Sequence, residues 1–199
     1  EDEVMSQAKI FHFGTLSMTH DGVRAATKHA IDVAMANNCI ISFDPNIRES
    51  LWPSMDIMRQ QLEYGLGKCH VLKISENEIQ WFTGIDDYDE AVAKLSDTYH
   101  IPLILLSLGK DGSRAYCNGH RAHADAYIRQ DTVETTGAGD TFGACCLHYV
   151  LEHGYKDLDE ADLFEMLNFA NAAASIITTR KGALRVMPTV EEVTRMING

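Results

Sequence analysis

The chain has 199 residues, 45% of them hydrophobic, which is enough for one domain with a real core. Seventeen basic and 29 acidic side chains give a net charge of −12 at pH 7, which argues against nucleic acid or an anionic membrane surface as the main partner. The five cysteines are an odd number and stand mostly in apolar runs, so they favour packed thiols in a reducing, cytoplasmic compartment.

Apolar runs of strand type alternate with segments of helical period through the first half of the chain. Breakers such as Gly14, Asp44-Pro45 and Gly84 separate these segments. The pattern predicts strands at residues 9–13, 39–43, 71–74 and 103–107, and helices at residues 19–38, 55–64, 77–82 and 89–99.

The pattern changes after Gly109, where Asn118-Gly119 gives a strong hairpin-turn signal between two short strands. Helices are then expected at residues 139–153, 160–178 and 190–197. Alternating strands and helices without long linkers predict a three-layer, doubly wound, mostly parallel sheet with a β-hairpin near residues 113–125, in a single α/β domain over residues 1–199. Ligands of such sheets bind at the carboxyl ends of the strands.

The most informative segment reads ETTGAGDTF and begins at Glu134. Three small residues, Gly137, Ala138 and Gly139, let the backbone approach a ligand and place N–H groups at a helix start, which favours an anion. The carboxylate of Asp140 stands beside them. An anion site next to a group that can take a proton suits phosphoryl transfer to an alcohol. A plain tight turn with Asp in the first helical turn is the alternative interpretation.

Several common motifs do not occur in this sequence. Gly109-Lys110 is followed by Asp111, where a Walker P-loop requires Ser or Thr. The dinucleotide pattern G-x-G-x-x-G fails because its third glycine position holds Phe142. Neither H-E-x-x-H, C-x-x-C nor G-x-S-x-G is present. Zinc protease, redox dithiol and hydrolase functions therefore lack support.

Three further segments follow predicted strands. Residues 107–112 form a strand-to-hairpin turn that could also hold the phosphate or ribose of a nucleotide. Glu78 is either a plain first-turn carboxylate or a group that orients the water shell of a metal ion. Arg48 follows the turn at residues 44–46 and could pair with a phosphate or a carboxylate.

These segments occur in the order found in the pfkB, or ribokinase-like, carbohydrate kinases, and the chain resembles that family over nearly all of its length. Residues 135–142 resemble the family's C-terminal signature, and residues 107–112 resemble its nucleotide loop. Residues 73–78 resemble its N-x-x-E region, and residues 169–183 its adenine-side segment. Residues 43–48, with Leu51-Trp52 after them, resemble the fructokinase and 2-keto-3-deoxygluconate kinase branches.

The resemblance implies a role for individual residues. Asp140 would be the base, and the N–H groups of Gly137, Ala138 and Gly139 would stabilise charge on the transferring phosphoryl group. Glu78 would act on Mg²⁺ through water, and Arg48 would reach the substrate or a phosphate. The residues expected at ATP are Ser75, Glu78, Ser107, Gly109, Gly112 and Asn171.

The resemblance also implies a monovalent-cation site at Glu134, Thr136 and Gly182. Glu134 stands where the family usually has Asp, and its extra methylene could displace a ligand of the cation. The sequence therefore does not decide whether K⁺ binds. The family's N-terminal portion, with its lid strands and much of the sugar site, has no counterpart in this chain, which begins with Glu1. This stretch is therefore expected to be inactive by itself.

The intact protein is expected to be an ATP-dependent phosphotransferase that acts on a sugar hydroxyl. Fructose is the favoured acceptor, and 2-keto-3-deoxygluconate, another hexose or a nucleoside are alternatives. A non-catalytic nucleotide-binding module or pseudoenzyme is the alternative from another functional class, and a structural domain without a ligand is a third. The expected partners are a sugar and a nucleotide, without nucleic acid or a membrane, in a cytoplasmic protein that forms a homodimer when intact.

Overall fold

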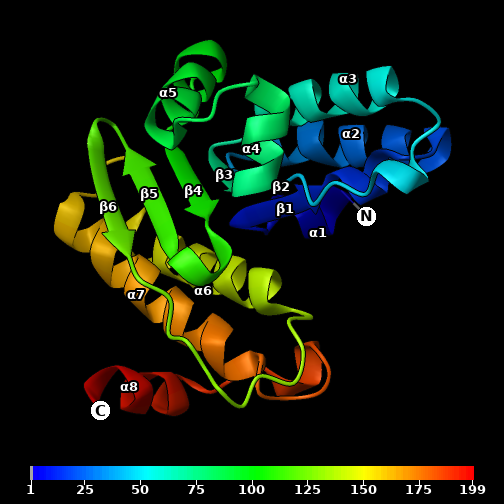
Figure 1. Cartoon of the computed structure of the whole chain (residues 1–199). Helices are drawn as coiled ribbons and strands as arrows, with labels where there is room; N and C mark the ends of the chain where they lie inside the picture. Colours follow the sequence, from blue (N-terminus) through cyan, green and yellow to red (C-terminus); the bar gives the residue numbers. More distant parts are fainter. Residues whose placement is uncertain (1) are drawn as a thin grey trace. The chain divides into compact units, whose positions relative to one another are not determined.

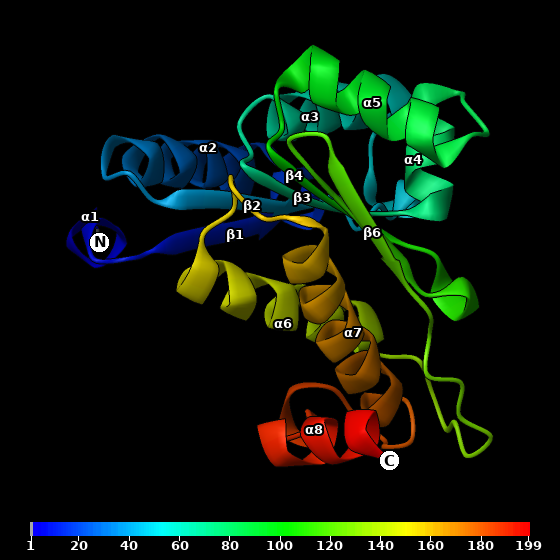
Figure 2. The ribbon, with the colours of Figure 1, turned by 90° about the vertical axis from the view of Figure 1, so that its left-hand side faces the viewer.

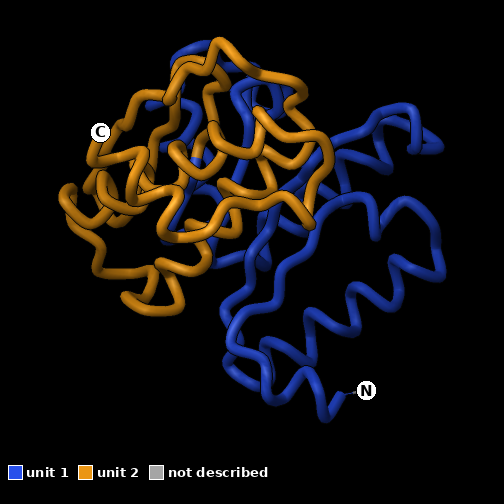
Figure 3. Tube along the Cα trace, turned by 90° about the horizontal axis from the view of Figure 1, so that it is seen from below, with its two compact units in different colours: residues 1–105 blue, residues 106–199 orange. Residues whose placement is uncertain are grey.

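The computed structural model describes residues 2–199. Within these residues, six strands form one hydrogen-bonded sheet in the order β1-β2-β3-β4-β5-β6. The chain divides by its internal contacts into two compact units, Glu1–Leu105 (unit 1) and Leu106–Gly199 (unit 2), which Figure 3 colours separately. The expectation of a single domain stays a prediction.

Unit 1 carries the parallel part of the sheet. Strand β1 pairs in parallel with β2, and β2 pairs in parallel with β3. Phe13 lies opposite Phe43 in this register, and their stacked rings are 4.6 Å apart between centroids. The elements of unit 1 are α1 (Asp2–Ser6), β1 (Ile10–Gly14), η1 (Thr15–Met18), α2 (Asp21–Ala36), β2 (Ile40–Asp44), η2 (Glu49–Leu51), α3 (Met55–Leu66), β3 (Val71–Ser75), α4 (Glu76–Thr83), α5 (Tyr88–Tyr99) and most of β4 (Leu103–Ser107).

Helix α3 shows why these residues fold as they do. Its N-cap Ser54 accepts a hydrogen bond from the N–H of Ile57 at 3.2 Å, and its apolar residues recur at helical spacing on a buried face. A Cβ placed on Gly65 would lie 2.5 Å from the ring of Phe43. Only glycine therefore allows α3 to come this close to β2, and both helices α2 and α3 lie along the strands of unit 1 (Figures 1 and 2).

Unit 2 holds the hairpin and the last three α-helices of the described residues. Strands β5 and β6 pair antiparallel, and the turn residues Asn118 and Gly119 both have positive φ, 46° and 88°, as a two-residue hairpin requires. Helix α7 packs against the hairpin, α6 and α8, as Figure 2 shows. The elements are η3 (Gly109–Asp111), β5 (Ser113–Cys117), β6 (His120–Ala124), α6 (Ala138–His153), α7 (Glu160–Ile177), η4 (Leu184–Val186) and α8 (Val190–Asn198).

The predicted strands and helices are all present, and their ends agree to within two residues. The predicted α/β class with a mostly parallel sheet and a hairpin is confirmed. Helix α1 was not predicted, because it is short and buries none of its residues. Across residues 2–199, the structure contains no helix that combines the length and apolar character needed to cross a bilayer.

Candidate active site

Helix α6 begins at a glycine in the left-handed region, as the ETTGAGDTF segment requires. Gly137 has φ +80°, and its carbonyl accepts the N–H of Thr141 at 2.8 Å to close the first turn. A Cβ at Gly137 would lie 3.2 Å from that of Ala183, so a side chain would be both strained and crowded. Within the described residues, no side chain caps this helix start.

The N–H groups in the first turn of α6 differ in whether they already have a hydrogen-bond acceptor. The N–H of Ala138 already donates to the carbonyl of Thr135 at 3.2 Å. The N–H groups of Gly139 and Asp140 stand in the first turn, where no carbonyl of the preceding turn can accept them. The positive end of α6 therefore offers backbone donors to an anion, although not all three of the amides named from the sequence are equally available.

Asp140 lies exposed in the first turn of α6. Its carboxylate makes no hydrogen bond or ion pair with any of residues 2–199. Next to it, the buried hydroxyl of Thr141 lacks a hydrogen-bond partner within the same range. A carboxylate that is exposed, unpaired and adjacent to backbone donors is free to accept a proton from a ligand bound at the helix start.

The three residues of the expected monovalent-cation site lie on two segments that meet. Glu134 Oε1 accepts the N–H of Gly182 at 2.5 Å, and the Glu134 N–H donates to the carbonyl of Thr178 at 3.2 Å. Thr136 is exposed on the same segment as Glu134. One oxygen of Glu134 is thus used in closing the loop onto Gly182, and the K⁺ site stays a prediction.

Asn171 holds the end of the hairpin rather than pointing freely at a ligand. Its side chain is buried in α7, and its Nδ2 donates to the carbonyls of Ala124 at 2.9 Å and Asp125 at 3.1 Å. Its Oδ1 accepts the hydroxyl of Ser113 at 2.9 Å. The amide donors of Asn171 are therefore occupied within unit 2, and its expected place beside a nucleotide stays a prediction.

The loop predicted at the nucleotide, residues 107–112, is a tight turn after β4. Gly109 and Gly112 both have positive φ, 56° and 85°. A Cβ at Gly112 would lie 2.1 Å from the carbonyl oxygen of Ala124, so no other residue fits there. The N–H of Leu108 donates to the carbonyl of Gly112 at 2.9 Å, which closes the turn, and Ser107 stands at its start on β4.

In unit 1, Ser75 and Glu78 come together as a capping box at the start of α4. Glu78 Oε2 accepts both the N–H of Ser75 at 2.9 Å and its hydroxyl at 2.7 Å. Glu78 Oε1 accepts the N–H of Ile47 at 2.8 Å, so this carboxylate also ties the segment after β2 to α4. Arg48, next along that segment, is exposed and donates to the carbonyl of Ile47 at 2.9 Å.

These contacts bear on the expected Mg²⁺. Residues 2–199 hold no group of three His, Cys, Asp or Glu residues placed to bind a metal ion directly. Glu78 accepts three hydrogen bonds, which leaves acceptor capacity on Oε1. That capacity fits an outer contact through water, the manner in which Mg²⁺ is often held beside phosphates.

The sequence analysis did not predict a buried ion pair near the carboxyl ends of β2 and β3. Lys73 Nζ lies 2.8 Å from Asp44 Oδ2, and the two side chains are 13% and 10% exposed. The other oxygen of Asp44 is buried without a partner in the described residues. Burial raises the pKa of Asp44 against the opposing effect of Lys73, and Glu78 raises it further. The signal that could have revealed the pair is the register of two neighbouring parallel strands.

A family model described as pfkB family carbohydrate kinase matches residues 2–190. The chain therefore belongs to the pfkB family of carbohydrate kinases. It is 36% identical over 197 residues to the probable fructokinase-4 of Arabidopsis thaliana, a match that covers 99% of this chain and 60% of that protein. The chain spans about three fifths of the length of the curated relatives that it matches first.

Solved structures agree with this assignment. A fructokinase with bound ATP from Xylella fastidiosa superposes with a TM-score of 0.90 at 26% identity, covering 100% of this chain and 64% of that one. A putative ribokinase II from E. coli in complex with ATP and Mg²⁺ gives a TM-score of 0.86 at 25% identity and covers 100% of this chain and 61% of that one. The ribokinase-like fold class predicted from the sequence is confirmed.

Proposed function

We propose that this chain is the nucleotide-side part of an ATP-dependent kinase that phosphorylates a sugar hydroxyl. The observation that carries the proposal is the exposed, unpaired carboxylate of Asp140 at the uncapped start of α6. Family membership and the fructokinases among the relatives support a sugar as the acceptor and fructose as the first candidate. 2-Keto-3-deoxygluconate, another hexose or a nucleoside are the other acceptors to compare.

The chemistry assigned to Asp140 is general-base catalysis. Asp140 takes the proton of the sugar hydroxyl, and the sugar oxygen forms a bond to the γ-phosphorus of ATP. The bond from that phosphorus to the bridging oxygen breaks, and ADP leaves with the electron pair. The amides at Gly137, Ala138 and Gly139 are assigned to the negative charge on the phosphoryl oxygens during transfer, and the Ala138 N–H would have to leave the carbonyl of Thr135 to take part.

The remaining residues are assigned to the nucleotide. Ser107, Gly109 and Gly112 form the close turn against which a phosphate or ribose packs, and Asn171 secures the adjoining end of the hairpin. Glu78 would hold a Mg²⁺ ion through water, and the bound ion would supply positive charge to neutralise the phosphate oxygens. Arg48 is exposed and able to reach a phosphate or the substrate.

The test replaces Asp140 in the intact protein. Asp140→Asn keeps the size and polarity of the side chain but not its basicity, so turnover of fructose and ATP should fall by about 10²- to 10⁴-fold while the ATP dissociation constant stays the same. ADP release measures the first quantity and calorimetry the second. Asp131→Asn, on the loop that precedes α6 and in an exposed pair with Arg129, is the matched control and should leave turnover unchanged. Full turnover by Asp140→Asn would refute the assigned base.

A non-catalytic nucleotide-binding module is the second candidate, favoured by one observation. Glu134 stands where the family usually has Asp, and its Oε1 accepts the N–H of Gly182. Two measurements separate the kinase, the module and a structural domain. Calorimetry of the 199-residue chain with ATP and Mg²⁺ measures nucleotide binding, and an assay of the intact protein measures sugar phosphorylation. Binding without any sugar phosphorylation by the intact protein favours the module, and absence of nucleotide binding favours a structural domain.

We also propose a cytoplasmic homodimer for the intact protein. The five cysteines, four of them buried, support a reducing compartment as packed side chains. Sedimentation of the intact protein tests the dimer, and fractionation of the cells that make it tests the compartment.

A further inference from the structure

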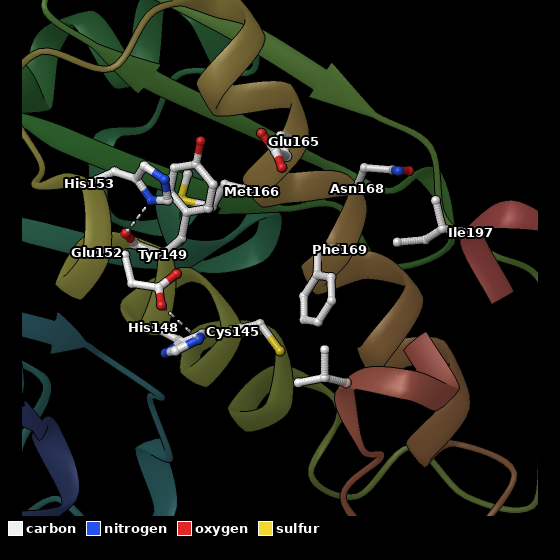
Figure 4. A pocket seen from close by; sticks show the side chains of 11 residues that line it. Cys145, His148, Tyr149, Glu152, His153, Glu165, Met166, Asn168, Phe169 and Ile197 are labelled. Atoms are coloured by element: carbon white, nitrogen blue, oxygen red, sulfur yellow. Dashed lines mark hydrogen bonds and ion pairs between the residues drawn. The ribbon is translucent and has the colours of Figure 1, made fainter. Parts of the chain in front are cut away.

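Helices α6, α7 and α8 of unit 2 line a partly open cavity of about 360 Å³ (Figure 4). This volume falls within the range of small-molecule sites in proteins. The cavity is lined by the second half of α6, from Cys145 to His153, and by the middle of α7. Asp140 and Asn171 do not contribute to it, so within the described residues it is separate from the proposed kinase chemistry.

The floor of the cavity is apolar and already formed. Met166 is buried, and Phe169 and Ile197 pack onto the buried cluster of Ala172, Ala173, Ile176 and Val193. Figure 4 shows Phe169 on α7 and Ile197 on α8 around the same space. An apolar ligand body would therefore be received without rearrangement of the helices.

One wall of the cavity is an ordered aromatic pair. The rings of Tyr149 and His153 stack with 4.1 Å between centroids. Tyr149 donates its hydroxyl to Asp162 Oδ1 at 3.2 Å, and the Nδ1 of His153 donates to the carbonyl of Tyr149 at 3.1 Å. These contacts fix the ring of Tyr149, whose face turned away from His153 can attract a cation.

The charges at the cavity have one sign. Glu152 from α6 and Glu165 from α7 line it, while within residues 2–199 neither Lys nor Arg does. His148 Nε2 lies 3.7 Å from Glu152 Oε1 at the rim of the cavity. Two carboxylates over an apolar floor complement a ligand that joins a positive charge to an apolar body and repel an anion of the same shape.

We propose that the α6–α7–α8 cavity is a binding site for a small organic cation, an amine or guanidine attached to an aromatic or branched aliphatic body. The apolar body packs on Phe169 and Ile197, and the positive group lies toward Glu152 and Glu165. Such a site is distinct from the site of phosphoryl transfer, and its test does not depend on kinase activity.

Three probes of one shape test the charge requirement. The 199-residue chain is titrated in a calorimeter with 2-phenylethylamine, 2-phenylethanol and phenylacetate at about pH 8 and about 0.15 M salt. The amine should bind at least about tenfold more tightly than the alcohol, and phenylacetate should bind most weakly. Equal affinities for the three probes, or no binding of the amine at millimolar concentration, would overturn the proposal.

A pair of variants tests the residues. Glu152→Gln together with Glu165→Gln should reduce the affinity for the amine about tenfold and leave that for the alcohol unchanged. The matched control, Glu63→Gln with Glu160→Gln, removes the same net charge from exposed positions outside the cavity and should bind the amine as the unaltered chain does. Equal loss of amine affinity in both double variants would show attraction by the net charge alone and reject the site. Circular dichroism confirms that each variant is folded.

Discussion

Lys73 lies opposite Asp44 where two parallel strands end, and their side chains form an ion pair of 2.8 Å in a largely buried setting. Extending by one residue the register that pairs Ser42 with Val71 and Phe43 with Leu72 brings these two residues opposite each other. Removing both charges from water is costly, and their attraction offsets that cost only while both are present. The pair is therefore a sensitive point for both the stability of unit 1 and its response to pH.

The first prediction concerns the loss of one partner. Lys73→Met should lower the free energy of unfolding by about 3 to 5 kcal/mol, because it leaves the buried carboxylate of Asp44 without a compensating charge. Urea unfolding followed by circular dichroism measures this change. The double variant Lys73→Met/Asp44→Asn should be less destabilised than Lys73→Met alone. A cost below about 1 kcal/mol for Lys73→Met would mean that the pair behaves like an exposed one.

The second prediction is a pH dependence with a definite sign. Burial raises the pKa of Asp44 above its ordinary value of 3.8, although the nearby ammonium of Lys73 opposes this effect. Between the unfolded and the folded pKa, the folded protein holds a proton that the unfolded chain has lost. The contribution of Asp44 to stability is therefore fully present below the unfolded pKa and is lost as the pH rises through the folded pKa.

The comparison that tests this sign is between the unaltered chain and Asp44→Asn. Asparagine does not titrate, so the difference in unfolding free energy, unaltered chain minus variant, should fall from about pH 4 upward and then level off. Denaturant unfolding at a series of pH values provides both curves. A difference that increases with pH would show that Lys73 outweighs burial and lowers the pKa of Asp44.

The third prediction concerns the close approach of α3 to β2. Gly65→Ala would place a methyl group 2.5 to 2.9 Å from three ring carbons of Phe43, which is fully buried and cannot move aside cheaply. Such overpacking should cost about 1 to 3 kcal/mol. Gly22→Ala, in α2 of the same unit with nothing within 4 Å of the added carbon, is the control and should be neutral or slightly stabilising. Thermal unfolding distinguishes the two, and equal midpoints would contradict the contact.

The strands and helices were predictable because each carries its own local signals. The strand at residues 103–107 begins with four consecutive apolar residues, and Asn118-Gly119 has the left-handed backbone that its turn requires. The start of α6 was predictable for the same reason, since small residues and Asp140 share one short segment.

The contacts of the site residues were less predictable, because their partners lie far along the chain. Glu78 was interpreted as a first-turn carboxylate or a metal contact, and its bond to the N–H of Ile47 spans 31 residues. The partners of Asn171 lie 46 to 58 residues away, on the hairpin and the segment after it. Local patterns show that a polar residue sits on a helix, but only the packed structure shows what satisfies its hydrogen bonds.

The fourth prediction follows from those partners of Asn171. Asn171→Ala removes two donors and one acceptor from a buried position and leaves Ser113 and the carbonyl of Ala124 unsatisfied. The cost in unfolding free energy should be about 1 to 3 kcal/mol. Ser113→Ala, which breaks only the hydrogen bond to Asn171 Oδ1, should cost less, and urea unfolding of the two variants measures the difference.

The ATP affinity of the same two variants shows whether Asn171 holds the hairpin in place or contacts the nucleotide directly. If Asn171 acts only by holding the end of β6 in place, Ser113→Ala should weaken ATP binding in proportion to the stability that this variant loses, because it removes a hydrogen bond that holds Asn171. If Asn171 contacts the base directly, Asn171→Ala should weaken ATP binding while Ser113→Ala leaves it intact. The occupied amide donors of Asn171 favour the first outcome, since a nucleotide would have to displace a buried backbone carbonyl to gain one of them.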